Sequence, residues 1–206
     1  MLTKQQLKIF ESFMKNVFGE HTIKEIKKDS SEKSNNAISI ALKKFKEEDL
    51  IKERVVGRSK LYILNTENDL IFHYFALINS NKLPKSAMKT IEQVKIEVKK
   101  YTSFFSIVVF GSYSIDEQKK DSDLDLAVFV ENDEIKKKVQ LALNSVKLKS
   151  IMKVDLHAIS QDEFLEMLKV DYANLGKEIA RKHLSIYNPT IFYSVLNKGV
   201  KNGFKL

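Results

Sequence analysis

The sequence predicts an α+β chain of 206 residues in two parts: three helices and a β-hairpin come first, and an α/β domain with a small mixed sheet flanked by helices follows. Residues up to Leu50 show helical apolar spacing, and two β-rich runs around a glycine turn come next. Later residues alternate continuous apolar runs with amphipathic helical patterns. We predict a first domain over 1–65, a connecting helix and linker over 66–85, and a second domain over 86–206.

Capping residues mark the helices of the first part. Thr3 with Gln6 and Thr22 with Glu25 have the spacing of capping boxes, which satisfy free amides at a helix start. Gly19 is expected to end the first helix.

A third helix and a hairpin complete the first part. The helix is predicted over 34–48, with apolar residues on one face and polar residues on the other. Two β-rich runs, 51–56 and 60–64, flank a turn at 57–59 that contains Gly57.

This order of three helices and a basic hairpin resembles the winged helix-turn-helix family over residues 1–65. The resemblance implies binding to double-stranded DNA, and by analogy a homodimer. Two alternatives stay open: the polar face of the third helix is simply solvated, or the domain binds another protein. The candidate DNA-binding residues are Lys33, Ser34, Asn35, Asn36, Ser39 and Lys43 on the helix, with Arg58 and Lys60 on the hairpin.

The second part begins after a connecting helix over 66–78, whose apolar face suits either a dimer seam or packing between domains. A helix over 86–100 comes next, and helices are expected to fill the chain after residue 159. Between them we predict strands over 104–110, 124–130 and 151–159, with a lysine-rich helix over 133–149.

Two aspartates open the second of these strands. An apolar strand ends at Gly111-Ser112, and after ten intervening residues Asp123-Leu124-Asp125 follows. Side chains two residues apart on a strand face the same side, about 7 Å apart, so both carboxylates can reach one metal ion. Carboxylate oxygens together with substrate phosphates suit magnesium.

Further polar residues are expected at the same place. Asp155 interrupts an apolar strand, where a carboxylate needs either a cation or exposure at the sheet end. Gly111 lets backbone approach a triphosphate, while Ser112 and the amides that follow, including that of Tyr113, can donate to phosphate oxygens, particularly if they begin a helix.

The Gly-Ser pair, the Asp-x-Asp pair and the later aspartate resemble the signature of nucleotidyltransferases related to DNA polymerase β, of the small "minimal" type. This resemblance implies transfer of a nucleoside monophosphate from an NTP, ATP first, to an acceptor. It implies Asp123, Asp125 and Asp155 as catalytic and metal-binding residues for Mg²⁺ or Mn²⁺. Asp155 would help to activate the acceptor hydroxyl. By family analogy the acceptor is a protein such as a HEPN-type toxin.

The chain departs from this pattern after the Gly-Ser pair. Many minimal members carry arginine and glycine there, whereas residues 113–116 read Tyr-Ser-Ile-Asp. Lys119 and Lys120 are the nearest cations. The competing hypothesis is a transcriptional regulator whose nucleotidyltransferase domain only binds nucleotide or a partner protein.

Composition narrows the function classes further. A net charge of +8 favours anionic partners, although lysine-rich surfaces are also simply solvated. The absence of cysteine excludes disulfides, thiolate metal sites and cysteine nucleophiles, and the four histidines are scattered. Two interpretations of His157 stay open: it lines the site beside Asp155, or, as we expect first, it is a packed strand residue. The longest apolar run is too short for a bilayer and no signal core opens the sequence, so we expect a cytoplasmic protein without membrane contact.

Overall fold

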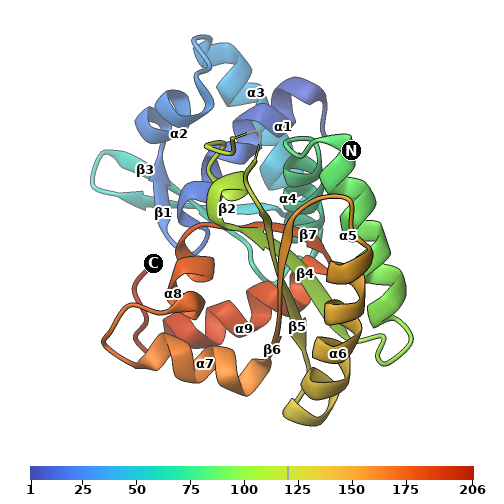
Figure 1. Ribbon diagram of the computed structural model, residues 1–206. Helices are drawn as coiled ribbons and strands as arrows, with labels where there is room; N and C mark the ends of the chain where they lie inside the picture. The colour runs from blue at the N-terminus through green and yellow to red at the C-terminus, as the bar shows by residue number, and fades with distance from the viewer. Residues whose placement is uncertain (120) are drawn as a thin grey trace. The chain divides into compact units, whose positions relative to one another are not determined.

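The computed structural model describes residues 1–119 and 121–206, and it divides the chain into two compact units, Met1–Ile78 and Asn79–Leu206 (Figure 1). The division falls inside the segment 66–85, which the sequence predicts as connecting helix and linker. Each unit is described by itself. No helix of the described residues is both long enough and apolar enough to cross a membrane.

Helices and a small sheet make up the first unit. Its elements in chain order are α1 (Lys4–Phe10), the 3-10 helix η1 (Glu11–Asn16), β1 (Glu20–Thr22), α2 (Ile23–Ser30), α3 (Asn35–Glu47), β2 (Ile51–Val56), β3 (Ser59–Leu64) and α4 (Leu70–Ser80). Both predicted capping boxes are present, at Thr3 and at Thr22. The Ser34 hydroxyl caps α3 by accepting from the Ala37 amide.

The predicted hairpin is confirmed, and a third strand extends it. β2 and β3 pair antiparallel up to Val56 and Ser59, and Gly57 in the turn has a φ of 59°, in the left-handed region. β1 pairs with β3, giving the order β1-β3-β2. The sequence does not predict β1, because a strand of three residues shows no periodicity. The first helix is also shorter than predicted, since α1 ends at Phe10 and continues as η1.

Aromatic rings fill the core of the first unit. The fully buried Phe10 ring lies 5.0 Å from that of Phe45 and 5.5 Å from that of Phe75, measured between centroids. Such offset and edge-on pairs stabilise a core beyond their area burial. Since Tyr74 and Phe75 of α4 both lie against the Phe10 ring, this side of the helix packs within the first unit.

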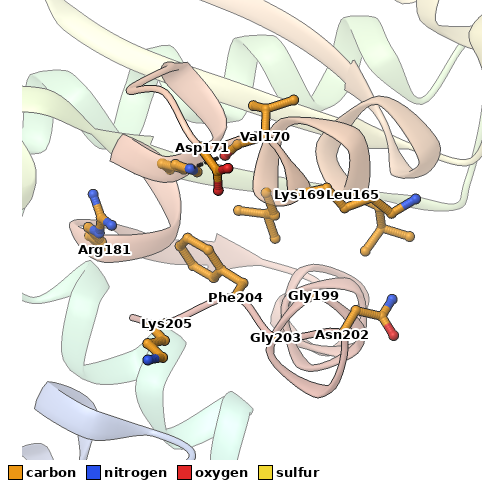
Figure 2. Close-up of a pocket in the computed structure, with 12 residues that line it drawn as sticks. Leu165, Lys169, Val170, Asp171, Arg181, Gly199, Asn202, Gly203, Phe204 and Lys205 are labelled. Atoms are coloured by element: carbon orange, nitrogen blue, oxygen red, sulfur yellow. Dashed lines mark hydrogen bonds between the residues drawn. The ribbon is translucent and has the colours of Figure 1, made fainter.

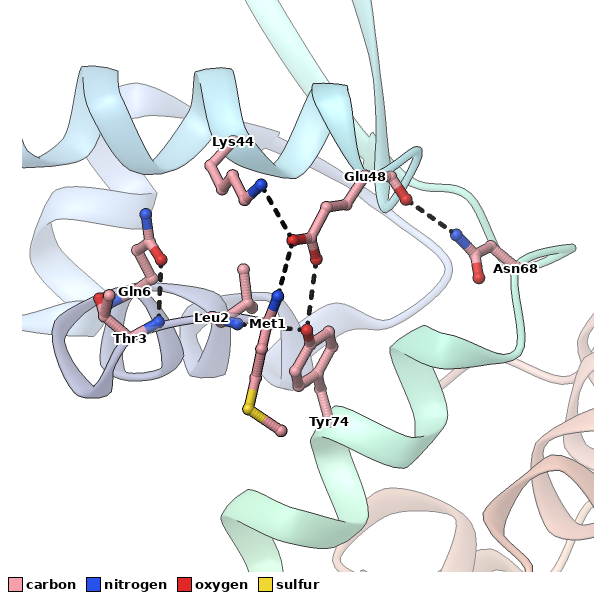
Figure 3. Close-up of polar contacts among 8 residues, drawn as sticks. All are labelled: Met1, Leu2, Thr3, Gln6, Lys44, Glu48, Asn68 and Tyr74. Carbon is pink, nitrogen blue, oxygen red and sulfur yellow. Dashed lines mark hydrogen bonds and ion pairs between the residues drawn. The ribbon is translucent and has the colours of Figure 1, made fainter.

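Glu48 joins the end of α3 to α4 (Figure 3). Its carboxylate lies 3.2 Å from both the Lys44 ammonium and the amine of Met1, and it accepts from the Tyr74 hydroxyl at 3.2 Å. The Asn68 side-chain amide donates to the Glu48 carbonyl at 3.1 Å. Burial acts to raise the pKa of Glu48, but the hydrogen bonds and charges of Lys44 and the amine outweigh it and lower this pKa.

The second unit contains a four-stranded mixed sheet with the order β6-β5-β4-β7. β5 and β6 are parallel, whereas β4 pairs antiparallel with both β5 and β7. Its elements are α5 (Lys85–Val98), β4 (Phe105–Phe110), the 3-10 helix η2 (Gly111–Ser114), β5 (Leu124–Val130), α6 (Asp133–Lys149), β6 (Val154–Ser160), α7 (Gln161–Lys169), α8 (Leu175–Arg181), β7 (Leu184–Tyr187) and α9 (Pro189–Lys201).

β7 corrects the prediction that helices fill the chain after residue 159. This strand pairs with β4 at Val108 and Val109. It is only four residues long, and it lies between two helical patterns that mask its alternation. Asn188, with a φ of 43°, turns the chain into α9, which begins with Pro189.

Helices cover both faces of this sheet (Figure 1). On one face, α5 and α6 pack against alternate strand residues such as Leu126, and on the other Phe129 contacts Phe164 of α7 and Phe192 of α9 at 4.8 and 5.0 Å between centroids. Every residue of β4 is buried, as its continuous apolar run predicts. The core therefore fixes the strand ends on which the site is built.

Candidate active site

The end of β4 and the start of β5 meet at Gly111 and Asp125. The antiparallel register places Asp125 opposite Phe110, and the chain turns at Gly111 with a φ of 62°. A Cβ atom at position 111 would overlap Oδ2 of Asp125. Glycine is therefore required here twice, for its backbone conformation and for the space that the carboxylate occupies.

Two neighbouring strands, β5 and β6, bring the predicted aspartates together. Asp125 lies beside Asp155 in the parallel register of β5 and β6, while Asp123 immediately precedes β5. Burial is the largest cause that raises the pKa of Asp125, to about 6, followed by the negative charges of Asp155, Asp123 and Glu178. The half-buried Asp125 thus sits in a locally negative environment, while Asp123 is exposed.

Asp155 has partners of its own. Its Oδ2 lies 2.7 Å from Nε2 of His157, and its Oδ1 lies 3.3 Å from the Lys147 ammonium. Burial acts to raise the pKa of Asp155, but His157 and Lys147 outweigh it and lower this pKa. Of the two interpretations of His157, the structure favours the position beside Asp155, because the ring is about one-third exposed and bonds to Asp155 as well as lying near Phe110.

The donor set suits a divalent cation in part. In the described part of the chain, no three acidic, histidine or cysteine side chains are gathered as a ready metal site. Asp123 and Asp125 can nevertheless face one ion from the same side of β5. Burial first, and then the charges of the neighbouring carboxylates, raise the pKa of Asp125, and a bound cation would favour its ionised form. Magnesium takes few protein ligands when phosphates supply the rest.

A cleft of about 810 Å³ lies beside the aspartates, between η2 and α8. Gly111 and Ser112 line one wall, and Lys177, Arg181 and Lys182 contribute to the other. These three cations are not among the predicted site residues, because the segment that carries them is predicted only as a helical tail. The i, i+4 spacing of Lys177 and Arg181 is the signal that places both on one helix face.

The remaining residues that the sequence predicts near the phosphates lie in or after the turn η2. η2 is a single 3-10 turn rather than the start of a longer helix, and the Ser114 hydroxyl donates to the Gly111 carbonyl at 2.7 Å. Tyr113 is partly buried and packs against the core that α5 and α6 cover. Lys119 is exposed, and Lys120 lies outside the described residues.

The predicted DNA-binding side chains all lie exposed on the first unit. A groove of about 540 Å³ between α3 and the hairpin is lined by Asn35, Ser39, Lys43 and Lys60 among others. Lys33, Ser34, Asn36 and Arg58 do not line it. Three of the eight side chains have partners within the unit: the Lys60 ammonium lies 2.9 Å from Glu53, the Asn35 side-chain oxygen accepts from Lys27 at 2.6 Å, and the Ser34 hydroxyl accepts from the Ala37 amide at 3.2 Å.

Comparisons with known proteins bear on the second unit. The family model described as polymerase beta, nucleotidyltransferase matches residues 92–183. One chain of a solved structure described as a toxin-antitoxin with AMP-PNP is similar at 18% sequence identity with a TM-score of 0.32, over 54% of this chain and 84% of that chain. Comparison with curated proteins finds no match. The segment that carries all three aspartates and the Gly111-Ser112 turn is therefore similar to the polymerase beta type of nucleotidyltransferase domain.

Proposed function

We propose that the second unit is a divalent-metal-dependent nucleotidyltransferase, which moves a nucleoside monophosphate from a nucleoside triphosphate to an acceptor. The observation that carries this proposal is the position of Asp125. Its carboxylate lies against the Gly111 turn, opposite the end of β4 and beside Asp155. Phosphate, metal and acceptor can therefore be held within a few side-chain lengths of each other. The match over residues 92–183 supports the same reaction class.

The proposed reaction replaces one P–O bond of the α-phosphorus with another. An oxygen of the acceptor hydroxyl bonds to the α-phosphorus, and the bond from that phosphorus to the oxygen bridging to the β-phosphate breaks, so that pyrophosphate leaves with the electron pair. Asp155 accepts the hydrogen bond and then the proton of the acceptor hydroxyl. The lowered pKa of Asp155 keeps its carboxylate ionised, so that it can accept the hydrogen bond; the proton moves to it as the hydroxyl becomes more acidic on bonding to phosphorus.

The remaining groups bind the nucleotide. Asp123 and Asp125 would hold Mg²⁺ or Mn²⁺, which supplies positive charge to the phosphoryl oxygens. The absence of a side chain at Gly111 leaves the backbone open to a phosphate, and Ser112 in the cleft wall can donate to it. Transfer then depends on orientation within the cleft rather than on a covalent intermediate.

The acceptor is proposed to be a hydroxyl group on a partner protein. This step rests on the sequence resemblance to minimal nucleotidyltransferases, for which a HEPN-type toxin is the expected class of partner. ATP is the proposed donor for the same reason.

Labelled nucleotide tests the proposal directly. The full chain is incubated with Mg²⁺, cell lysate and ATP labelled at the α-phosphate, and a discrete labelled product is expected. ATP labelled at the γ-phosphate should give none, which separates nucleotidyl from phosphoryl transfer. The Asp123→Ala, Asp125→Ala double variant should be inactive, whereas the exposed neighbour Asp121→Asn serves as the matched control. Equal labelling by wild type and double variant would refute the assignment.

A second candidate function concerns the first unit. We propose that it is a winged helix that binds double-stranded DNA, because the polar face of α3 and the tip of the hairpin present exposed amides, hydroxyls and cations around one groove. Together the two activities fit an enzyme that also controls transcription. The competing hypothesis is a regulator whose second unit binds nucleotide without transferring it, and the labelling experiment separates the two.

A further inference from the structure

Helix α8 and Lys182, the residue that follows it, bring three cations to the cleft that also contains Gly111 and Ser112. We propose that Lys177, Arg181 and Lys182 bind the polyphosphate chain of the nucleotide, so that the donor is recognised mainly by its charge. The inference rests on the proposed function, whose donor site it specifies.

The cleft has the size and the walls that such a ligand needs. Its volume of about 810 Å³ lies within the usual range of roughly 300–1,000 Å³ for small-molecule sites. Gly111 and Ser112 form the wall next to Asp125, and α8 faces them across the cleft. A nucleotide lying between these walls has its phosphates within reach of both the turn and the helix.

The cations of α8 are available to an anion. Elsewhere in the second unit, lysines such as Lys136 and Lys169 are paired with glutamates. Among the residues that the structure describes, neither Arg181 nor Lys182 has an ion-pair partner, and Lys182 is exposed. Lys177 is partly buried, and its ammonium donates to the Val170 carbonyl, which fixes its position without neutralising its charge.

The spacing of the cations along α8 and the residues of the opposite cleft wall place these cations near the aspartates. Lys177 and Arg181 are one helical turn apart, so they can contact successive phosphate groups. Glu178, between them in the sequence, also lines the cleft, and Gly111 in the opposite wall lies against the carboxylate of Asp125. A polyphosphate held along α8 therefore reaches the carboxylates that would hold its metal ion.

Arg181 is held in place by an aromatic ring (Figure 2). Its guanidinium carbon lies 5.8 Å from the ring centroid of Phe204, which is only 9% exposed. This contact is in a second hollow of about 250 Å³, which shares Lys177 and Arg181 with the cleft. A guanidinium stacked on an aromatic face loses less freedom when it binds phosphate oxygens.

Inorganic tripolyphosphate in EDTA is the probe, because it has no base and needs no transfer chemistry. Calorimetry on the full chain at low salt is expected to show binding that weakens as salt rises. Arg181→Gln and Lys182→Gln should each weaken it roughly tenfold, since a hydrogen bond to a charged group is lost. Arg181→Lys should retain part of the affinity. Phe204→Leu leaves every charge in place and should fall between wild type and Arg181→Gln.

Lys198→Gln and Lys201→Gln are the matched controls, since these lysines of α9 change the net charge equally but do not line the cleft. Both should bind tripolyphosphate as wild type does. Absence of binding to wild type, or wild-type affinity in the Arg181→Gln, Lys182→Gln variant, would overturn the inference. The Asp123→Asn, Asp125→Asn variant separates the two proposals, because it should lose transfer yet keep or improve tripolyphosphate affinity in EDTA. Normal binding by a wild type that labels no acceptor would contradict only the proposed function.

Discussion

The carboxylate of Asp125 occupies the space that a side chain at Gly111 would fill. The positive φ of Gly111 and the position of the Asp125 carboxylate therefore depend on each other. The turn brings the backbone next to the carboxylate, and the carboxylate leaves no room for a side chain at position 111.

Gly111→Ala is expected to lose metal-dependent nucleotide binding and to destabilise the protein by more than the backbone conformation alone. The matched control is Gly57→Ala, where φ is 59° instead of 62° and nothing lies within 4 Å of the added Cβ. That control isolates the cost of a left-handed residue, about 1–2 kcal/mol. Denaturant melts of both variants measure the difference. Equal destabilisation would contradict the close approach, and Asp125→Ala added to Gly111→Ala should recover the excess.

Asp125→Asn should stabilise the metal-free protein at neutral pH. The pKa of Asp125 is about 6 in the folded protein and 3.8 in the unfolded chain, so folding disfavours the ionised carboxylate. The wild type therefore loses stability as pH rises from about 4 to about 6, and the full loss remains at higher pH. Melting temperatures in EDTA from pH 4 to 8 should therefore show a gain for the variant that grows up to about pH 6 and then stays level. Wild-type Mg²⁺ affinity should weaken below about pH 6, as Asp125 takes up a proton. A variant less stable than wild type at pH 7.5 would argue against this crowding of charge.

Asp155→Asn should abolish transfer while keeping most of the nucleotide affinity. The amide keeps the shape of the carboxylate but cannot take the proton of the acceptor hydroxyl. Single-turnover labelling measures transfer, and calorimetry with a non-hydrolysable ATP analogue measures binding. His157→Gln is the companion variant, since it removes the ring bonded to Asp155 without removing the carboxylate, and should lower the rate less. Wild-type transfer by Asp155→Asn would remove Asp155 from the proposed mechanism.

Local signals explain why much of this site could be predicted. The buried run before Gly111 and the alternation around Asp125 specify two strands, and their register fixes which residues meet. The bond between Asp155 and His157 could not be predicted, because both carboxylate and ring have several rotamers and only packing selects among them. The spacing of Lys177 and Arg181 places both on one helix face, but their position opposite Gly111 across the cleft could not be predicted, because it depends on contacts between segments far apart in the sequence.

His183 should make the second unit sensitive to acid. Nδ1 lies 2.9 Å from the Ile179 carbonyl and Nε2 lies 3.0 Å from the Tyr193 hydroxyl, so the neutral ring donates to the first and accepts from the second. Burial lowers the pKa of His183 to about 4, from 6.5. Because the unfolded chain takes up the proton first, stability is expected to fall as pH drops from about 6.5 to about 4. His183→Gln should be less stable at pH 7 but should lack this part of the pH dependence, as denaturant melts at several pH values would show. An unchanged slope would contradict the neutral, buried state.

Duplex DNA binding by the first unit should depend on salt through the cations of α3 and the hairpin. Each lysine or arginine that contacts a phosphate releases counterions, so the slope of log affinity against log salt should become shallower by about one per contact removed. Arg58→Ala is expected to lose more than Lys60→Ala, because Lys60 is already paired with Glu53 whereas Arg58 is exposed at the turn. The combined variant to be titrated replaces Lys33, Lys43, Arg58 and Lys60 with alanine.

Sequence preference should depend on different side chains from overall affinity. Asn36→Ala should chiefly reduce the ratio of specific to random binding, because a side-chain amide can read base edges while carrying no charge. Asn35→Ala should act less on this ratio, since the Asn35 oxygen is already engaged by Lys27. Lys4→Ala with Lys8→Ala, which removes two exposed cations of α1, is the control for net charge. Titrations of full-length protein with a selected and a random duplex at several salt concentrations separate the two effects. If the full chain binds neither duplex at low salt, the DNA-binding hypothesis fails, and the first unit is better explained as a protein-interaction module.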